Sequence, residues 1–218
     1  MAQWSYSALT SFETCPRKHY HTRVKKDVKE TQGEAATWGQ HVHKSFEDRV
    51  LKDKPLPRGL QQWEPMLAKL AGKDGEILAE TQIALDENHN KVSWFDRSVW
   101  VRCVLDYAII NNGHAVVLDY KTGKPKPDSD QLKLFAAVLM DTRPDVHTVS
   151  TGFLWLKTKE IYKETYTRDQ LADLWQTFLP RVQRLDYALE NNKWPPRPSG
   201  LCRKHCPCTG CEFNGLRG

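Results

Sequence analysis

The chain has 218 residues, of which 27% are charged and 39% hydrophobic, and its formal net charge is +5. This length supports one substantial core, and the balance is that of a globular rather than a disordered protein. The sequence contains no run of about eighteen apolar residues and no basic and apolar leader, so we expect a cytoplasmic protein without a membrane span. The mild positive charge permits binding to a polyanion, although solvated surface lysines explain it equally well.

The first half of the chain changes from helical to strand-like patterns. Apolar residues recur at helical spacing in segments 5–20, 34–51 and 62–70, which predicts three helices. Alternation of apolar and polar residues then predicts strands at 77–85, at 92–95 merging into 98–110, and at 115–121.

The second half adds two helices and a hairpin. Helical spacing returns from Asp128 to Met140, and strands are predicted at 148–156 and 161–166. The last helix opens at Thr167 with a capping-box pattern and extends to Glu190, with a kink at Pro180. This order predicts a mixed α/β fold in one domain, 1–218, made of an N-terminal helical segment (1–33), a core (34–193) and a proline-rich connector with a cysteine-rich end (194–218).

Asn112-Gly113 is a strong hairpin signal between two predicted strands. If these residues form a two-residue loop, counting outward brings Asp106 directly opposite Asp119. Like charges at such a position destabilise a sheet, so the pair needs a cation, and a bound metal is the obvious candidate. Lys121 projects from the same strand face as Asp119. The three residues indicate a metal-dependent phosphodiesterase.

The ligand set of this metal extends to a predicted helix. His43 together with Asp106, Asp119 and the main-chain carbonyl of Tyr120 forms a set suited to Mg²⁺ or Mn²⁺. Such a metal lowers the pKa of a bound water and stabilises charge on phosphate. A histidine on a helix is otherwise a common surface or core residue.

Three further side chains surround this expected site. Lys121 would orient the water or neutralise the phosphate, and Gln131 would hydrogen-bond the lysine, the water or the DNA backbone. Glu80 could contribute another carboxylate, but a solvent-facing glutamate is the preferred interpretation.

In this order the motifs resemble those of a known nuclease superfamily. They are Ser7-x-Leu9-x2-Phe12-x2-Cys15-Pro16-x3-Tyr20, Gly39-x3-His43, Leu105-Asp106-Tyr107, Leu118-Asp119-Tyr120-Lys121-Thr122-Gly123 and Gln131-x3-Phe135. The combination resembles the PD-(D/E)xK superfamily, in particular its RecB-like exonuclease branch, which includes CRISPR-associated adaptation nucleases and free-standing phage enzymes.

The resemblance implies a restriction-endonuclease-like fold, a mixed β-sheet flanked by helices. It also implies that His43, Asp106 and Asp119 bind the metal, that Lys121 is catalytic and that Gln131 is an accessory polar residue. Phe135 departs from the tyrosine common in the family, so a contact that needs this hydroxyl is in doubt.

The chain has six cysteines, and four of them lie within ten residues of one another: Cys202, Cys206, Cys208 and Cys211. These four form a second candidate site. Disulfides are not expected in a reducing cell interior. This density is typical of a zinc or an iron–sulfur site, and unligated thiols are the alternative.

The resemblance implies a [4Fe–4S] cluster that joins the two chain ends through Cys15, Cys202, Cys206 and Cys211. Cys208 is then a spare thiol. A structural Zn²⁺ held by the terminal cysteines is the alternative.

We therefore expect a metal-dependent DNA exonuclease of recombination, repair or phage DNA metabolism, acting on single strands or duplex ends with a recombination or replication protein as possible partner. The resemblance favours 5′→3′ polarity. The alternatives are a catalytically silent DNA-binding module, an endonuclease of the same fold that acts with a partner protein, and a structural zinc-binding protein.

Overall fold

The computed structural model describes residues 2–30, 33–125 and 129–215. The chain forms two compact units. We call residues 33–177 the sheet unit, and residues 1–32 together with 178–218 the terminal unit. The expected single domain, with its boundaries near residues 33 and 193, stays a prediction.

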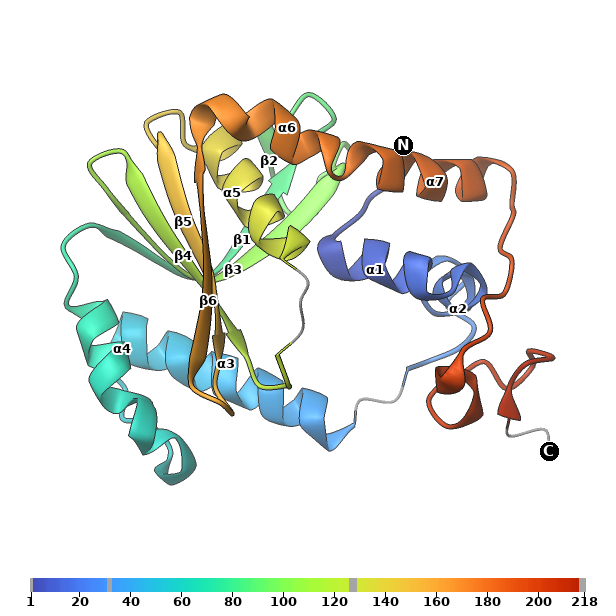
Figure 1. The fold of residues 1–218 in the computed structure, drawn as a ribbon, viewed down its shortest axis with the longest axis horizontal. Coiled ribbons are helices and arrows are strands. Elements are labelled where there is room, and N and C mark those ends of the chain that lie inside the picture. Colours follow the sequence, from blue (N-terminus) through green and yellow to red (C-terminus); the bar gives the residue numbers. More distant parts are fainter. Residues whose placement is uncertain (1, 31–32, 126–128, 216–218) are drawn as a thin grey trace. The chain divides into compact units, whose positions relative to one another are not determined.

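A six-stranded mixed sheet forms the centre of the sheet unit (Figure 1), with the strand order β2-β1-β3-β4-β5-β6. Neighbouring strands are antiparallel except β4 and β5, which are parallel. A helical crossover is the usual connection for such a parallel pair, and helix α5 lies between these two strands in the sequence. The strands are β1 (Glu76–Leu85), β2 (Lys91–Val92), β3 (Val101–Asn111), β4 (His114–Lys121), β5 (Thr148–Trp155) and β6 (Glu160–Thr167).

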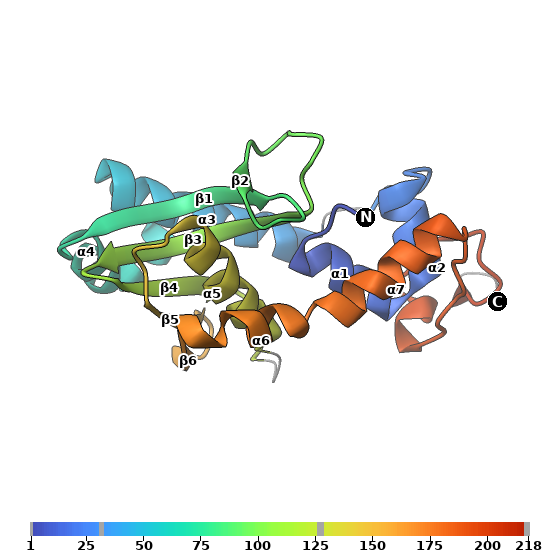
Figure 2. The ribbon, with the colours of Figure 1, turned by 90° about the horizontal axis from the view of Figure 1, so that it is seen from above.

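Helices cover both faces of this sheet. One face packs against α3 (Glu34–Lys52) and α4 (Glu64–Ala71), and the other against α5 (Asp130–Thr142), as Figures 1 and 2 show. On the α3 side, aromatic and aliphatic residues from the helices and strands form a core cluster: Val42, Phe46, Leu56, Leu60, Trp63, Leu67, Tyr107, Ile109, Tyr120 and Leu154. The expected mixed α/β sheet flanked by helices is confirmed.

The β3–β4 hairpin forms at the expected turn. Asn112 and Gly113 have φ angles of 48° and 76°, and two positive angles are what a two-residue loop of this twist requires. Asn111 pairs with His114, and the strand pairing continues away from the turn in the predicted register as far as Tyr107 and Leu118. Local turn chemistry therefore sets the alignment that positions the two aspartates.

Two predicted elements differ from the observed ones. Only Val92 of the expected strand 92–95 belongs to β2, and residues 93–95 form a turn in which the Asp96 N–H donates to the Ser93 carbonyl oxygen at 3.0 Å. Segment 5–20 splits at Cys15 into α1 (Tyr6–Thr14) and α2 (Pro16–His19), since proline cannot continue a helix. The expected start of α5 at Asp128 lies outside the described residues.

The last predicted helix is also divided. The Thr167–Gln170 capping box is present and opens η3 (Arg168–Gln170), which leads into α6 (Leu171–Gln176). A separate helix, α7 (Leu179–Glu190), begins just before Pro180, where proline is tolerated in a first turn.

Within the terminal unit, α1 packs against α7. The Arg181 guanidinium donates to both carboxylate oxygens of Glu13 at 2.8 and 2.7 Å, and the rings of Trp4 and Phe178 stack at 5.6 Å. A π-helical turn (Tyr20–Val24) follows α2, and a 3₁₀ turn (Gly200–Arg203) lies in the cysteine-rich end. Another 3₁₀ turn, Arg58–Trp63, precedes α4 in the sheet unit. None of the described helices combines the length and apolarity needed to span a membrane.

Candidate active site

Three acidic residues lie side by side on neighbouring strands of the sheet. The strand pairs on either side of Glu80 in β1 place it opposite Asp106 in β3. The β3–β4 ladder ends one residue before Asp106, so its register brings Asp119 of β4 next to the same residue. Asp106 and Asp119 are 8% and 4% exposed. A row of carboxylates with two buried members needs positive charge close by.

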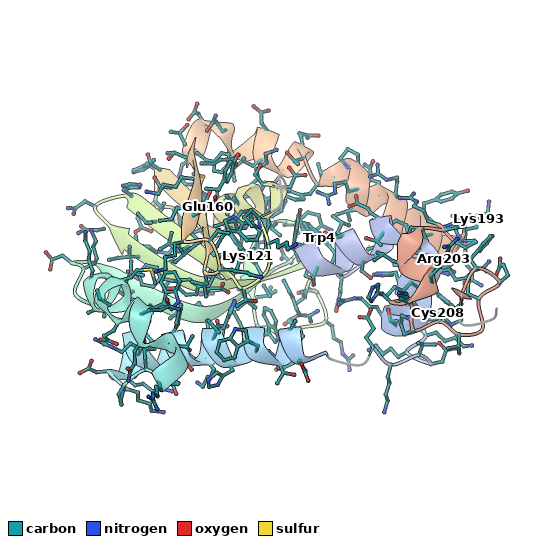
Figure 3. The ribbon with its side chains drawn as sticks, turned by 60° about the horizontal axis from the view of Figure 1, so that its bottom comes forward. Trp4, Lys121, Glu160, Lys193, Arg203 and Cys208 are labelled. Atoms are coloured by element: carbon teal, nitrogen blue, oxygen red, sulfur yellow. The ribbon has the colours of Figure 1, made fainter. Side chains whose placement is uncertain are left out.

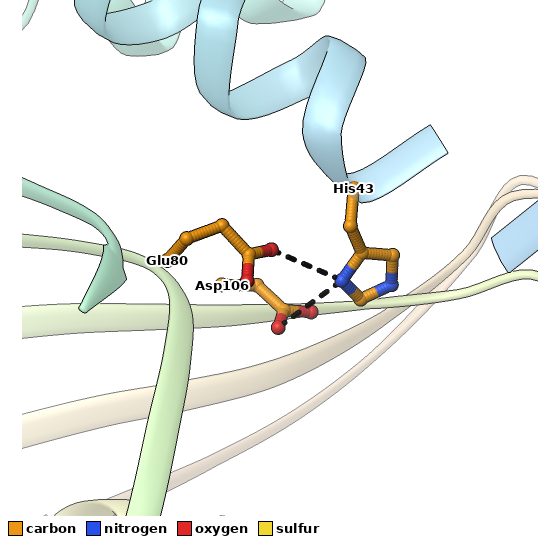
Figure 4. A group of neighbouring side chains, drawn as sticks. All are labelled: His43, Glu80 and Asp106. Carbon is orange, nitrogen blue, oxygen red and sulfur yellow. Dashed lines mark hydrogen bonds and ion pairs between the residues drawn. The ribbon is translucent and has the colours of Figure 1, made fainter. Parts of the chain in front are cut away.

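His43 of α3 supplies part of that charge (Figure 4). Its Nδ1 lies 3.2 Å from Glu80 Oε1 and 3.3 Å from Asp106 Oδ1. Its Nε2–H donates to the Tyr120 carbonyl oxygen at 2.9 Å. The ligand atoms of His43, Glu80 and Asp106 lie within 4.8 Å of one another, which is close enough to share one cation.

The carboxylates change the proton affinity of this imidazole. Burial lowers the pKa of His43, but hydrogen bonds to Asp106 and Glu80 outweigh it and raise the pKa to about 10. The protonated ring therefore acts as the counter-charge of the two carboxylates. A metal at the same position would replace that proton.

Asp119 belongs to an adjoining group with the predicted lysine and glutamine. Lys121 Nζ lies 2.6 Å from Asp119 Oδ2 and donates to Gln131 Oε1 at 2.8 Å. The Gln131 amide donates to the other Asp119 oxygen at 3.3 Å. The ammonium also lies 4.9 Å from the centre of the Phe153 ring, so the side chain is held from several directions.

Negative charge is incompletely balanced at Asp119. Burial, followed by the charge of Asp106, raises the pKa of Asp119 to about 7, although Lys121 and His43 oppose this shift. Asp106 Oδ2 is itself occupied, because it accepts the Tyr120 backbone N–H at 2.8 Å. The site therefore retains a net attraction for a further cation.

The structure revises the expected role of Glu80. The sequence favoured a solvent-facing side chain, and that interpretation is wrong, because the half-buried Glu80 carboxylate faces His43. Its φ of 46° is left-handed, which costs a non-glycine residue about 1–2 kcal/mol. Such strain is concentrated at functional sites. No short-range sequence signal predicts this placement, because β1 and β3 are joined by a long connection rather than a tight turn.

The predicted metal ligands thus lie in two neighbouring groups of side chains. His43 and Asp106 lie together with Glu80, Asp119 is paired with Lys121, and the Tyr120 carbonyl accepts a hydrogen bond from His43.

In the terminal unit, five cysteines line one small cavity: Cys15, Cys202, Cys206, Cys208 and Cys211. Cys208 is 4% exposed, and its burial, with its thiol neighbours, raises its pKa to about 12. The sixth, Cys103, is buried in β3. The expected four ligands and the expected spare thiol therefore share one cavity.

Several N–H groups point at the sulfur atoms of this cavity. The backbone N–H groups of Arg197 and Ser199 donate to Cys15 Sγ and Cys202 Sγ, each at 3.4 Å, and the Arg17 guanidinium donates to Cys211 Sγ at 3.9 Å. Donors to sulfur stabilise thiolates and tune the metals bound to them. The donor set suits a metal–thiolate centre.

Known proteins resemble this chain in sequence pattern and in fold. The solved structure of a protein called SSO0001 is 14% identical to the chain with a TM-score of 0.50, over 97% of this chain and 86% of its own. A protein from Eubacterium rectale, called "Putative exonuclease", is 13% identical with a TM-score of 0.53, over 94% and 86%. Comparison with curated proteins gave no match. The family model of the PD-(D/E)XK nuclease superfamily matches residues 3–216, and the chain belongs to this superfamily.

Proposed function

We propose that this protein is a metal-dependent exonuclease that hydrolyses phosphodiester bonds of DNA. The row of Glu80, Asp106 and Asp119 across three strands, with Lys121 beside it, is the observation that carries the proposal. The "Putative exonuclease" among the similar folds agrees with it. We propose 5′→3′ polarity and a role in recombination, repair or phage DNA metabolism on the family resemblance alone.

The residues fit a hard divalent cation. Carboxylate oxygens from Glu80, Asp106 and Asp119 with one imidazole nitrogen of His43 suit Mg²⁺ or Mn²⁺. The raised pKa of Asp119 indicates unbalanced negative charge in the absence of such an ion. When bound, the cation would activate water and stabilise charge on the phosphate.

The chain's own residues would position the reacting groups. The Lys121 ammonium lies between Asp119 and Gln131, so it can neutralise charge on the scissile phosphate and orient the attacking water. Gln131 holds that lysine through one amide atom and Asp119 through the other. The contact between His43 and the Tyr120 carbonyl fixes the ring at the edge of the carboxylate row.

The direct test is digestion of linear single- and double-stranded DNA, labelled at either end, against a covalently closed circle. Metal-dependent loss of linear DNA alone is the expected result, and the first labelled product gives the polarity. Cleavage of the circle would indicate an endonuclease. No cleavage with Mg²⁺ or Mn²⁺ would indicate a silent DNA-binding module instead.

Glu80 is expected to matter for the metal. Because its carboxylate lies close to the His43 imidazole and the Asp106 carboxylate, Glu80→Gln should weaken Mn²⁺ binding by about 10-fold or more. Titration followed by electron paramagnetic resonance measures the affinity. Glu160→Gln, at an exposed position of β6, is the matched control, and equal affinities in the two variants would remove Glu80 from the site.

Metal affinity is also expected to increase with pH. The pKa of His43 is raised to about 10, so at neutral pH its Nδ1 carries a proton that the metal must displace. Mn²⁺ affinity should therefore rise by up to about tenfold per pH unit between about pH 8 and pH 9, where Asp119, with its pKa of about 7, is already ionised. In His43→Gln the Mn²⁺ affinity should increase less steeply with pH. The same dependence of affinity on pH in that variant and in the wild type would contradict the role of His43 as a metal ligand.

We further propose that the cysteine cavity holds a [4Fe–4S] cluster through Cys15, Cys202, Cys206 and Cys211, with a structural Zn²⁺ as the alternative. The shared cavity and the N–H donors to three of these sulfurs support a metal–thiolate site. The resemblance favours iron over zinc. The centre would join the chain ends and have no direct part in hydrolysis.

A further inference from the structure

The positive charge of the protein is concentrated in the terminal unit. This unit contains 13 Lys and Arg against 6 Asp and Glu, a net charge of +7, whereas the sheet unit has 19 against 21, a net charge of −2. A polyanion is therefore attracted to the unit that lacks the candidate active site.

A groove of about 1080 Å³ lies within this terminal unit, between α1, α7 and the segment after α7. This is above the usual range of small-molecule pockets, ~300–1000 Å³. Three aromatic and four cationic side chains characterise its lining: Phe12, Tyr187, Trp194, Arg17, Arg184, Lys193 and Arg197.

The aromatic residues of the groove differ in how tightly they are held. Phe12 is buried, and its ring meets that of Trp194 edge to face at 6.2 Å. The Trp194 ring also contacts the Tyr20 ring, with the ring centroids 5.1 Å apart. Tyr187, by contrast, is 53% exposed on α7, so its side chain is accessible to a stacking base.

Two of the four groove cations are paired with carboxylates, Arg17 with Glu212 and Arg184 with Glu13 at 3.4 Å, and two are not within the described part of the chain. The one lining carboxylate of the groove, that of Glu13, is held by two hydrogen bonds from Arg181. Lys193 Nζ lies 3.1 Å from the Tyr187 hydroxyl and 5.5 Å from the centre of its ring (Figure 3 labels Lys193). Among the described residues, no ion pair joins Lys193 or Arg197 to a carboxylate.

We propose that this groove binds unpaired nucleotides of a DNA single strand. Tyr187 would be the platform on which a base stacks, and Lys193, Arg184 and Arg197 would contact the phosphates. Exposed aromatic rings interleaved with cations are how single-stranded nucleic acids are bound without sequence preference. A duplex offers the same phosphates but keeps its base faces stacked internally, so the groove favours single strands.

This proposal rests on the proposed function, because it names the form of DNA that the nuclease holds. Binding can nevertheless be measured apart from hydrolysis. The experiment uses the full chain, purified anaerobically with the Asp119→Ala substitution and without divalent metal. Fluorescence anisotropy then reports the affinity for labelled oligo-dT and for a duplex of equal length.

Tyr187→Ala is expected to weaken oligo-dT binding by about tenfold, within the range of base–aromatic stacking, and duplex binding much less. Tyr187→Phe keeps the ring and should bind like the parent. Lys193→Gln should lower the slope of log affinity against log salt by about 0.7, the loss of one phosphate contact. The matched controls are Phe95→Ala and Lys69→Gln, both exposed positions of the sheet unit.

Oligo-dT affinity of Tyr187→Ala within twofold of the parent would overturn the proposal. An equal loss for single strand and duplex would also overturn it, because the ring would then not report base stacking. If the groove variants behave as expected but the wild-type protein hydrolyses no DNA, the groove stands and the proposed function fails. If the wild type hydrolyses DNA but Tyr187→Ala binds oligo-dT like the parent, the proposed function stands and the groove proposal fails.

Discussion

Lys121→Ala is expected to reduce DNA hydrolysis by about 100- to 1,000-fold, the scale of losing one positioned group that stabilises charge in the transition state. The Lys121 ammonium contacts Asp119 and Gln131, and an alanine at this position has no charge to neutralise the phosphate. Asp119→Ala should have a similar effect by removing a metal ligand. Rates on end-labelled linear DNA with Mg²⁺ measure both losses.

Loss of activity must be separated from loss of the fold, and Asp119→Asn does this. Because the pKa of Asp119 is raised to about 7, its ionised form destabilises the folded state progressively as pH rises above its ordinary value near 4. The asparagine variant should therefore unfold at an equal or higher temperature than the wild type at pH 8 in a chelator. Lys69→Ala is the matched control for the lysine, and activity near the wild-type level in Lys121→Ala would refute the site.

Cys15→Ser is expected to abolish metal binding at the cysteine cavity and to destabilise the terminal unit. Cys15 is far in sequence from the other thiols but lines the same cavity. Its substitution therefore removes the ligand through which the metal would connect the N-terminal segment to the C-terminal one. Binding of a metal to the folded chain alone also stabilises the fold. Visible absorption with iron, sulfide and zinc analysis measures the loss, and differential scanning calorimetry measures the destabilisation.

Cys208→Ser is the matched control for this prediction. Cys208 is buried in the same cavity but is the expected spare thiol, so its variant should retain the metal. Four iron and four sulfide per chain would support the cluster, and one zinc would support the alternative. Retention of full metal content in Cys15→Ser would remove Cys15 from the ligand set.

The two units differ in the chemistry that they offer a DNA substrate. The sheet unit carries the carboxylate row and a net charge of −2, and the terminal unit carries the cysteines and a net charge of +7. Affinity and hydrolysis are therefore expected to respond to different substitutions. Substitutions at Tyr187 should alter binding, and those at Lys121 should alter rate.

Much of the candidate site could be predicted from sequence because its alignment depends on local chemistry. The Asn112-Gly113 turn sets the β3–β4 register, and this places Asp106 beside Asp119 by counting alone. The period of two in a strand then puts Lys121 on the side of Asp119. These steps involve residues less than twenty positions apart, where a tight turn leaves few alternatives.

Glu80 and the groove were decided only by the tertiary structure. The pairing of β1 with β3 depends on the packing of the whole sheet, so no turn signal indicates that Glu80 faces Asp106 and His43. The left-handed backbone at Glu80 is likewise held by its surroundings rather than by its own preference. Phe12 and Tyr187 come together because α1 packs on α7. The sequence by itself thus determined the mixed sheet, the aspartate pair and its lysine, while contacts between distant segments decided the third carboxylate and the groove.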